Sequence, residues 1–451
     1  MNFLTTVAIV TTIITTAGAQ NNRVTQNEGD QAKIATQDWI KNNHIPIFQV
    51  EPEHGFLDLN LLKPVLKGKK IVALGESTHG TREFFQMKHR LLEFLVKKMG
   101  FKVFVIEASY SASIRSINQY VLHGIGSLDE VLASQGFWIW DTQEMKSMIE
   151  WMRKYNQTVA DNSKIKFLGC DLQINAQAYT VIKNYIQKTA PEKFTSIDSL
   201  LLLIENRESE KIFPPDSTVA QWIMPVKELQ TYLIMNKGGL VLKSSEVEFE
   251  STLIHLRLIL QWLEVFSKGH FHGEGNRDWY MAENMKYLIS REKEDTKFIF
   301  WAHNSHIGKS SRYKRTGYYL RQAFGDDYYS IAFDFYEGGF QSREYSDNKD
   351  GDLKEFIIHE SPNYSLPGLF VEAGIEKGFI DLRGAPSNVV WWLDNKAYIH
   401  SSGSRFNNDW STREKHFATF PFKMAEEFDG VLFIRKTSRS RPNPSGMRYG
   451  K

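Results

Sequence analysis

The fold of this chain is decided by residues 71–108, which read IVALGESTHGTREFFQMKHRLLEFLVKKMGFKVFVIEA. Residues 71–76 are a short apolar run of the kind that forms buried strands, and residues 102–108 are a second such run. Between them, residues 83–100 place apolar side chains at helical spacing: Phe84, Met87, Leu91 and Leu95. Gly100 is expected to end this helix. Strand, helix and strand in this order predict a right-handed βαβ unit with parallel strands.

The same alternation continues along the chain and is interrupted once. Further strands are predicted at residues 164–171, 297–302, 328–335 and 430–436, and further helices near 36–42, at 111–124 and at 144–156. Residues 177–290 are helical in pattern throughout, a stretch too long for an ordinary connection. We therefore expect an α/β fold with a central, mainly parallel sheet flanked by helices. Its core consists of residues 51–176 and 291–436, and the helical insertion 177–290 acts as a lid or cap.

The two ends of the chain differ from this core. Residues 1–19 read MNFLTTVAIVTTIITTAGA, an uncharged apolar segment with an A-x-A-like site at its end, which is typical of a secretory signal peptide. The alternatives are an uncleaved N-terminal anchor and a cytosolic, β-prone tail. We expect export to the periplasm, or a cytoplasmic protein if the leader is not used. Residues 20–50 are interpreted as a polar leader and first helix, and residues 437–451 as a basic, disordered tail.

Charge and cysteine content exclude several classes of protein. Lys and Arg number 55 against 53 Asp and Glu, a net charge of +2 that gives no support to nucleic-acid binding. The single cysteine, Cys170, excludes a disulfide framework and an all-cysteine zinc site. After residue 19 no segment approaches the roughly 20 apolar residues of a membrane span. The mature chain is expected to have no membrane or nucleic-acid partner, and its oligomeric state is not predicted.

Polar side chains gather at the ends of the predicted strands. Ligands of open parallel sheets bind beyond the carboxyl ends of the strands, so residues at those ends are candidates for a site. Four strands deliver three histidines and three carboxylates there: Glu76, His79, Glu107, Asp171, His303 and His306. Each residue alone could have a purely structural role, such as that of a packing histidine or a helix-capping carboxylate. Their convergence predicts one functional cluster.

The residue types favour activation of water by a general base. The chain has no G-x-S-x-G elbow, Walker A loop or H-E-x-x-H helix, and no dinucleotide fingerprint. Cys170 lies within a predicted buried strand, where a small core residue is expected. Histidine suits proton transfer near neutral pH, and a neighbouring carboxylate can orient it. Lys88 falls on the buried face of its helix, so its ammonium either reaches the carboxylates or extends outward to solvent.

At these residues the chain resembles the erythromycin esterase family. The resemblance spans roughly residues 60–436 and begins with Gly75-Glu76-Ser77-Thr78-His79-Gly80, followed by Glu83, Lys88, Gly100-Phe101 and Glu107. Its later pieces are Trp138, Glu144, Trp151-Met152-Arg153 with Asn156, Gly169, Asp171, Arg277-Asp278 with Met281, Trp301 to His306, Gly317 to Leu320, Phe324-Gly325 and Phe428-Asp429-Gly430.

The resemblance implies hydrolysis of the macrolactone ester of 14-membered macrolides such as erythromycin, without a metal or other cofactor. It makes His79 the general base, with Glu76 and Glu107 positioning base and water. His303 and His306 would polarise the carbonyl, stabilise the oxyanion or protonate the leaving alkoxide. Lys88 stands where the family often has arginine, which leaves a bidentate contact there in doubt. The remaining supporting and substrate-binding residues are Asp171, Arg153, Trp138 and Trp140, although core packing is expected for at least one tryptophan.

Three other functions remain open. The same machinery could hydrolyse another ester or lactone, as in relatives associated with exopolysaccharide biosynthesis. The apparent leader is a departure that fits this function and an exported macrolide esterase equally. Three histidines with carboxylates could instead hold zinc with an open position. The cleft could also belong to a binding protein without turnover. No partner beyond a small-molecule substrate is expected.

Overall fold

The computed structural model describes residues 28–173, 175–210, 216–269, 274–347, 349–407 and 419–444. The expected signal peptide, residues 1–19, lies outside the described residues. Residues 28–43 are helical, in the region where the first helix is expected. Among the described residues, no helix has the length and apolar character needed to cross a membrane.

The decisive stretch folds as its pattern predicts. Strand β2 (Ile71–Leu74) is followed by helix α3 (Arg82–Met99) and strand β3 (Phe101–Ser109). Gly100 ends α3 in the left-handed region, with φ of 75° and its N–H donating to the last carbonyls of the helix, a conformation that glycine adopts at no steric cost. Both strands pair in parallel with β5 (Lys297–Trp301), which lies between them in the sheet although it comes nearly 200 residues later.

The strands form one large, mainly parallel sheet. In spatial order it runs β4 (Lys166–Asp171), β3, β5, β2, β6 (Tyr328–Ser346), β12 (Gly430–Thr437), β8 (Lys377–Asp381) and β1 (Ile45–Pro46). Every pair from β4 to β12 is parallel, and β8 and β1 add antiparallel strands at one edge. The predicted α/β class is confirmed.

Helices cover both faces of the sheet. Alternate residues of β2 divide between two apolar cores, with Val72 and Leu74 on one side and Ile71 and Ala73 on the other. The first core includes α3 and α7 (Gln143–Gln157), and the second includes α13 (Arg277–Ser290), α15 (Thr316–Phe324), α16 (Leu366–Glu372) and α17 (Ser387–Asn395). Shorter helices are α2 (Lys63–Leu66), α4 (Tyr110–Ala112), α5 (Asn118–His123), α6 (Leu128–Ala133), α14 (Asn304–Ile307) and α19 (Met424–Glu427). The helix expected at 111–124 is divided by a π-helical turn at Ser113–Ile117.

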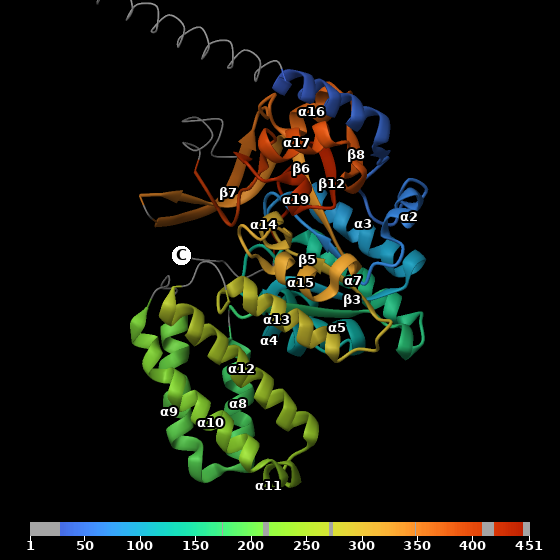
Figure 1. The fold of residues 1–451 in the computed structure, drawn as a ribbon. Helices are drawn as coiled ribbons and strands as arrows, with labels where there is room; N and C mark the ends of the chain where they lie inside the picture. Colours follow the sequence, from blue (N-terminus) through green and yellow to red (C-terminus); the bar gives the residue numbers. More distant parts are fainter. Residues whose placement is uncertain are drawn as a thin grey trace, which may run out of the picture.

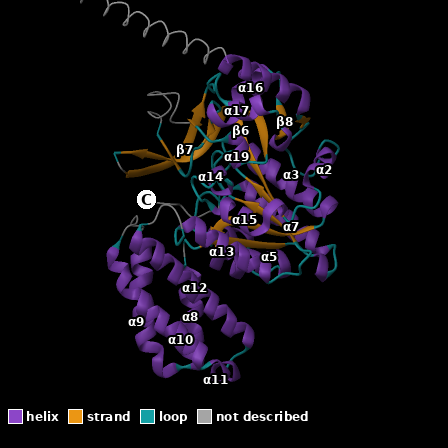
Figure 2. Cartoon of the chain, viewed as in Figure 1, coloured by secondary structure: helices purple, strands orange, loops and turns teal. Residues whose placement is uncertain are grey.

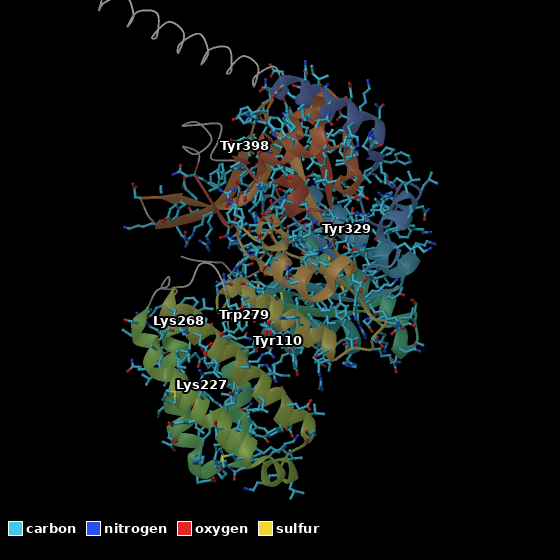
Figure 3. The ribbon with its side chains drawn as sticks, viewed as in Figure 1. Tyr110, Lys227, Lys268, Trp279, Tyr329 and Tyr398 are labelled. Carbon is cyan, nitrogen blue, oxygen red and sulfur yellow. The ribbon has the colours of Figure 1, made fainter. Side chains whose placement is uncertain are left out.

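A separate helical bundle projects from the sheet (Figure 1). It contains α8 (Ala176–Thr189), α9 (Phe194–Ser209), α10 (Ile223–Met235), α11 (Lys237–Leu242) and α12 (Glu246–Lys268), which bury a third apolar core of their own. Figure 2 shows the described residues of this part of the chain as helices joined by loops. In Figure 3 the labelled Lys227 and Lys268 lie on the bundle, whereas Tyr329 and Tyr398 lie in the α/β part. Its action as a lid stays a prediction.

Three features differ from the sequence-based expectations. Strand β6 is far longer than residues 328–335, because its second half pairs with β7 (Lys349–Ile358) in an antiparallel arm that projects from the sheet (Figure 1) and also pairs with β10 (Arg405–Phe406). Strands β9 (Ile399–His400) and β11 (Thr419–Phe420) form a small separate pair. The expectation of a disordered tail is wrong for residues 437–444, which lie along the molecule in a series of backbone hydrogen bonds. The rest of that tail, residues 445–451, lies outside the described residues.

Candidate active site

The carboxyl ends of four adjacent parallel strands meet at one edge of the sheet, where a pocket of about 510 Å³ opens. The pocket is lined by His79, Glu107, Phe137, Ile139, Trp140, Asp171, Gln173, Arg277, His303, Ser305, His306, Tyr313, Arg315, Ser401, Gly403, Ser404 and Phe422. Five of the six residues expected at strand ends are among these, and the sixth, Glu76, lies directly behind His79. None of the described residues of α8 to α12 lines this pocket.

Glu76 is the centre of the first cluster and is fully buried. Its Oε1 lies 2.6 Å from Nδ1 of His79, while Oε2 accepts hydrogen bonds of 2.6 Å from both Lys88 Nζ and Trp301 Nε1. Burial alone would raise the pKa of this carboxyl, but the Lys88 ammonium and the bond from His79 hold it at about 2. Because the carboxylate stays ionised, it fixes the Nδ1–H tautomer of His79 and leaves Nε2 as the basic atom.

Lys88 decides between the two interpretations of its helix position. Its side chain is fully buried, and the ammonium lies 4.1 Å from the centre of the Trp301 ring as well as on Glu76. It does not extend outward to solvent. Burial lowers the pKa of Lys88 to about 8 against the attraction of Glu76, so the ammonium remains charged at neutral pH. A cation here keeps Glu76 ionised and gains from the face of the indole ring.

A second cluster joins Glu107 and Asp171 through an arginine. Nη2 of Arg277 donates to Glu107 Oε1 and to Asp171 Oδ2, each at 2.8 Å. The other oxygen of Glu107 accepts the backbone N–H of His303 at 2.9 Å. Burial would raise the pKa of Glu107, but the charges of His306 and Arg277 hold it well below its usual range. Arg277 thereby pairs with both buried carboxylates, and His306 is a second cation beside Glu107.

His306 is held between two carboxylates. Its Nδ1 lies 2.7 Å from Asp278 Oδ1 and its Nε2 lies 3.2 Å from Glu107 Oε1. Asp278 is itself fixed by Arg315 Nη1 at 3.1 Å and by the N–H of Thr316 at 3.0 Å. Burial by itself would lower the pKa of His306, but the two carboxylates raise it to about 9. His306 is therefore an imidazolium at neutral pH.

His303 has the opposite character. Burial, with the charges of His79 and His306, lowers the pKa of His303 to about 3, so the ring is neutral. Its Nδ1 accepts the backbone N–H of Ser305 at 3.2 Å and lies 2.9 Å from Ser305 Oγ. Its ring centre lies 5.1 Å from that of His79. A histidine this weakly basic is poorly suited to activate Ser305 as a nucleophile, because a general base works best with a pKa near the working pH.

Two expected residues lie away from the pocket. Trp138 is buried in the first apolar core and does not line the pocket. Trp140 packs on Trp301 and also lines the pocket. Arg153 donates from Nη1 to the carbonyl of Leu122 at 3.1 Å, near the C-terminal end of α5. An arginine at a helix C-terminus satisfies an otherwise unpaired carbonyl, which is a structural role.

Arg277, Asp278 and Arg315 are site residues that the strand-end argument missed. They lie on α13 and just before α15, so no strand end delivers them. Two features of the sequence could have identified these residues. Buried carboxylates need cations as partners, and the Arg277-Asp278 pair is part of the resemblance to the family. Among the described residues, no group of three or more His, Cys, Asp and Glu side chains is placed to hold a metal ion.

The charged groups of the site are paired, and His306 is protonated at neutral pH whereas His303 is neutral. Glu76 with His79 presents a basic ring nitrogen to the pocket, and His306 presents a proton donor. The aromatic and apolar part of the pocket lining consists of Phe137, Ile139, Trp140 and Phe422. This arrangement can deprotonate a water through His79 and protonate a leaving group from His306, in a pocket that is partly apolar.

Comparison with known proteins adds a family and a fold. A family model described as Erythromycin esterase matches residues 96–437. The Erythromycin esterase type II of Escherichia coli is 26% identical over 438 residues, which cover 90% of this chain and 98% of that protein. A Bacillus subtilis (strain 168) protein named as a hydrolase, YbfO, is 22% identical over 435 residues, covering 89% of this chain and 91% of that protein.

Solved structures show the same fold. A Bacillus cereus protein aligns with a TM-score of 0.76 at 25% identity, covering 91% of this chain and 99% of that one. A succinoglycan biosynthesis protein aligns with a TM-score of 0.74 at 23% identity, over 90% and 97% of the two chains. The erythromycin esterase EreC, with a histidine-to-asparagine substitution and in its open conformation, gives 0.65 at 16% identity over 87% and 97%.

Proposed function

The chain belongs to the erythromycin esterase family, and from this premise we propose that it hydrolyses the macrolactone ester of 14-membered macrolides such as erythromycin, opening the ring and conferring resistance. The family is one of ester hydrolases. The observation that carries the proposal is the clamp on Glu76, whose two oxygens hold His79, Lys88 and Trp301 at 2.6 Å each. It fixes a general base at the wall of a partly apolar pocket.

The first step is attack by water. Nε2 of His79 takes one proton from a water as the oxygen bonds to the lactone carbonyl carbon, and the carbonyl oxygen becomes an oxyanion. Glu76 stabilises the imidazolium that forms, because its carboxylate lies 2.6 Å from Nδ1. Arg277 and the protonated His306 line the same pocket and supply positive charge to the oxyanion. No covalent acyl-enzyme forms.

The second step expels the alcohol. The carbonyl re-forms as the bond from carbon to the ring oxygen breaks, and the leaving alkoxide takes a proton from His306. The proton that His79 gained returns to His306 or to solvent. The product is an open-chain hydroxy acid, so one water is added and nothing else is consumed. Glu107 supports this step as one of the two carboxylates that hold His306, at 3.2 Å from Nε2.

The pocket walls suit a large and mostly apolar ester. Trp140, Phe137 and Phe422 offer aromatic surface, and aromatic walls contribute much of the binding energy of apolar ligands. The volume of about 510 Å³ accommodates the reacting part of a macrolide, and the open side leaves room for the remainder. The bundle of α8 to α12 is a candidate lid that would close over the bound drug.

Mass spectrometry of erythromycin incubated with the purified chain tests the proposal. We expect a product heavier by one water, with lost antibacterial potency, both with and without EDTA. His79→Ala should abolish turnover, and Lys97→Ala on the exposed side of α3 is the matched control. An unchanged drug in the presence of folded wild-type protein would refute the macrolide substrate. Activity lost only with EDTA would refute the mechanism without a metal.

A second candidate is hydrolysis of another ester by the same machinery. The polar part of the pocket lining favours this candidate, because Gln173, Ser401 and Ser404 can form hydrogen bonds with the hydroxyl groups of a polar substrate. A panel of acyl esters and lactones, including acylated sugars, would separate the two. Higher kcat/KM for a sugar ester than for erythromycin would favour the second candidate.

Residues 1–19 supply a separate proposal, export of the chain to the periplasm. Mass determination of the protein recovered from periplasmic and cytoplasmic fractions tests it. A mature chain beginning near Gln20 in the periplasmic fraction is the expected result, and an intact chain confined to the cytoplasm would contradict it.

A further inference from the structure

A short arm follows the last strand of the sheet and crosses the edge where the site lies. It comprises Ser438 to Asn443, directly after β12. Ser440 is fully buried and Asn443 nearly so, while Arg441 and Pro442 face solvent. A tail held this firmly is unusual for a Pro- and Ser-rich segment, and its partners explain it.

The first half of the arm pairs with the loop that carries His79. The N–H of Ser440 donates to the carbonyl of Gly80 at 2.8 Å, and the N–H of Arg82 donates to the carbonyl of Ser438 at 3.0 Å. Ser438 also donates to the carboxylate of Glu83 from both its N–H, at 2.7 Å, and its hydroxyl, at 2.6 Å. Gly80 immediately follows His79, so this half of the arm restrains the backbone beside the proposed base.

The second half pairs with the segment that follows Trp140. The N–H of Gln143 donates to the carbonyl of Arg441 at 2.8 Å, and the N–H of Asn443 donates to the carbonyl of Asp141 at 3.0 Å. Arg441 also donates to the buried carboxylate of Glu144, from Nε at 2.7 Å and from its N–H at 3.0 Å. Asp141 is the residue after Trp140, which forms part of the pocket wall.

We infer that the arm Ser438 to Asn443 is a positioning element of the active site, which holds the base His79 and the aromatic wall at Trp140 in register with one another. This inference rests on the proposed function of the pocket. The two loops are separated by some 60 residues in the chain, and six consecutive residues bridge them with main-chain bonds on both sides. A displacement of about 1 Å at a reacting group can cost about a hundredfold in rate, so such a bridge has kinetic consequences.

The two halves predict different kinetic effects. Loosening the His79 side misplaces the base, which acts in the transition state and not in substrate binding, so kcat falls and KM does not change. Loosening the Trp140 side weakens contact with ground state and transition state alike, which raises KM. A general loss of stability would move both constants together with the folded fraction, so the separation of kcat from KM identifies positioning.

Ser440→Pro tests the first half, because proline lacks the N–H that bonds Gly80. Ser440→Ala is its matched control, since the Ser440 hydroxyl has no hydrogen-bond partner among the described residues. The double variant Arg441→Ala, Asn443→Ala tests the second half, with the exposed Arg435→Ala on β12 as control. Kinetics on erythromycin are measured for each variant, together with thermal unfolding and deuterium uptake of residues 76–83 and 137–144.

We expect Ser440→Pro to lower kcat about tenfold with KM within about twofold, and the double variant to raise KM about fivefold with kcat nearly unchanged. Controls should match the wild type. Parallel changes of kcat and KM, or no change, in folded protein would overturn the inference. If Ser440→Pro does not fold, the double variant decides. If the wild type hydrolyses no erythromycin, the proposed function fails, and deuterium uptake then tests the role of the arm. Increased exchange confined to the loop that each variant loosens supports the inference. Unchanged exchange overturns it.

Discussion

Replacing Lys88 with methionine tests the central clamp of the site most directly. Lys88→Met keeps a long side chain of similar volume against Trp301 but removes the cation that lies 2.6 Å from Glu76. The carboxylate of Glu76, which is fully buried, keeps its bonds to Trp301 and His79 and loses its charge partner. We expect the variant to be less stable and nearly inactive.

The size of the effect follows from the pKa of Glu76. The clamp lowers that pKa from an ordinary 4.5 to about 2, which at 1.36 kcal/mol per unit is about 3 kcal/mol of stabilisation of the carboxylate. Breaking a buried ion pair by removing one partner commonly costs about 3 to 5 kcal/mol, in agreement. Without Lys88, burial raises the pKa of Glu76 toward neutrality, and a protonated Glu76 no longer supports the imidazolium of His79. We expect kcat to fall at least about a hundredfold.

The sign of the pH dependence is a second readout. A carboxyl whose folded pKa is depressed stabilises the protein fully above its unfolded pKa, and that contribution is lost as pH falls from 4.5 through about 2. The stability difference between wild type and Lys88→Met should therefore be largest at neutral pH and shrink below pH 4.5.

Guanidinium unfolding at pH 7 and pH 4, with kcat measured on the ester that the wild type hydrolyses, makes the comparison. Lys97→Met is the matched control on the same helix, because the Lys97 side chain is partly exposed and its ammonium lies 3.7 Å from Glu93, whereas the Lys88 side chain is fully buried and its ammonium lies 2.6 Å from Glu76. Our reasoning is refuted if Lys88→Met unfolds within about 1 kcal/mol of wild type at pH 7 and retains most of its rate.

Three further predictions concern other residues of the site. The pKa of His306 is raised to about 9, so its protonated form contributes stability that is complete below about pH 6.5 and lost as pH rises through 9. We expect kcat to decline over the alkaline part of this range. A kcat profile that is flat to pH 10 would contradict the role of His306 as the acid. Asp278→Asn removes the carboxylate 2.7 Å from Nδ1 of His306, so the alkaline limb of the kcat profile should shift to lower pH by about one unit or more; an unshifted limb would assign it to another group. Trp140→Ala should raise KM about tenfold or more through lost contact with substrate, while Trp151→Ala, whose ring stacks on Tyr155 in the core, should lower the unfolding temperature with KM nearly unchanged; the reverse pattern would exchange their roles.

The sequence by itself determined the parallel part of the sheet and the residues that its strand ends bring to the site. Apolar runs with helices between them predict parallel strands, and parallel strands place their carboxyl ends at one edge. The positions of Glu76, His79, Glu107 and His303 followed from that rule alone, since each lies near the C-terminal end of its strand. The buried environment of Lys88 was visible as an option, because helical periodicity puts it on the apolar face.

Only the tertiary structure decided which groups pair and with what charge. Arg277 comes from α13, and it meets Glu107 only because the chain returns after the helical bundle. The sequence did not separate Trp140, which reaches the pocket, from Trp138, which is two residues earlier and is buried in the core. The arm after β12 looked disordered in composition, since its order depends on main-chain bonds to distant loops. Periodicity is a local property, whereas the protonation state of His306 depends on carboxylates brought together by folding, and no local pattern records that distance.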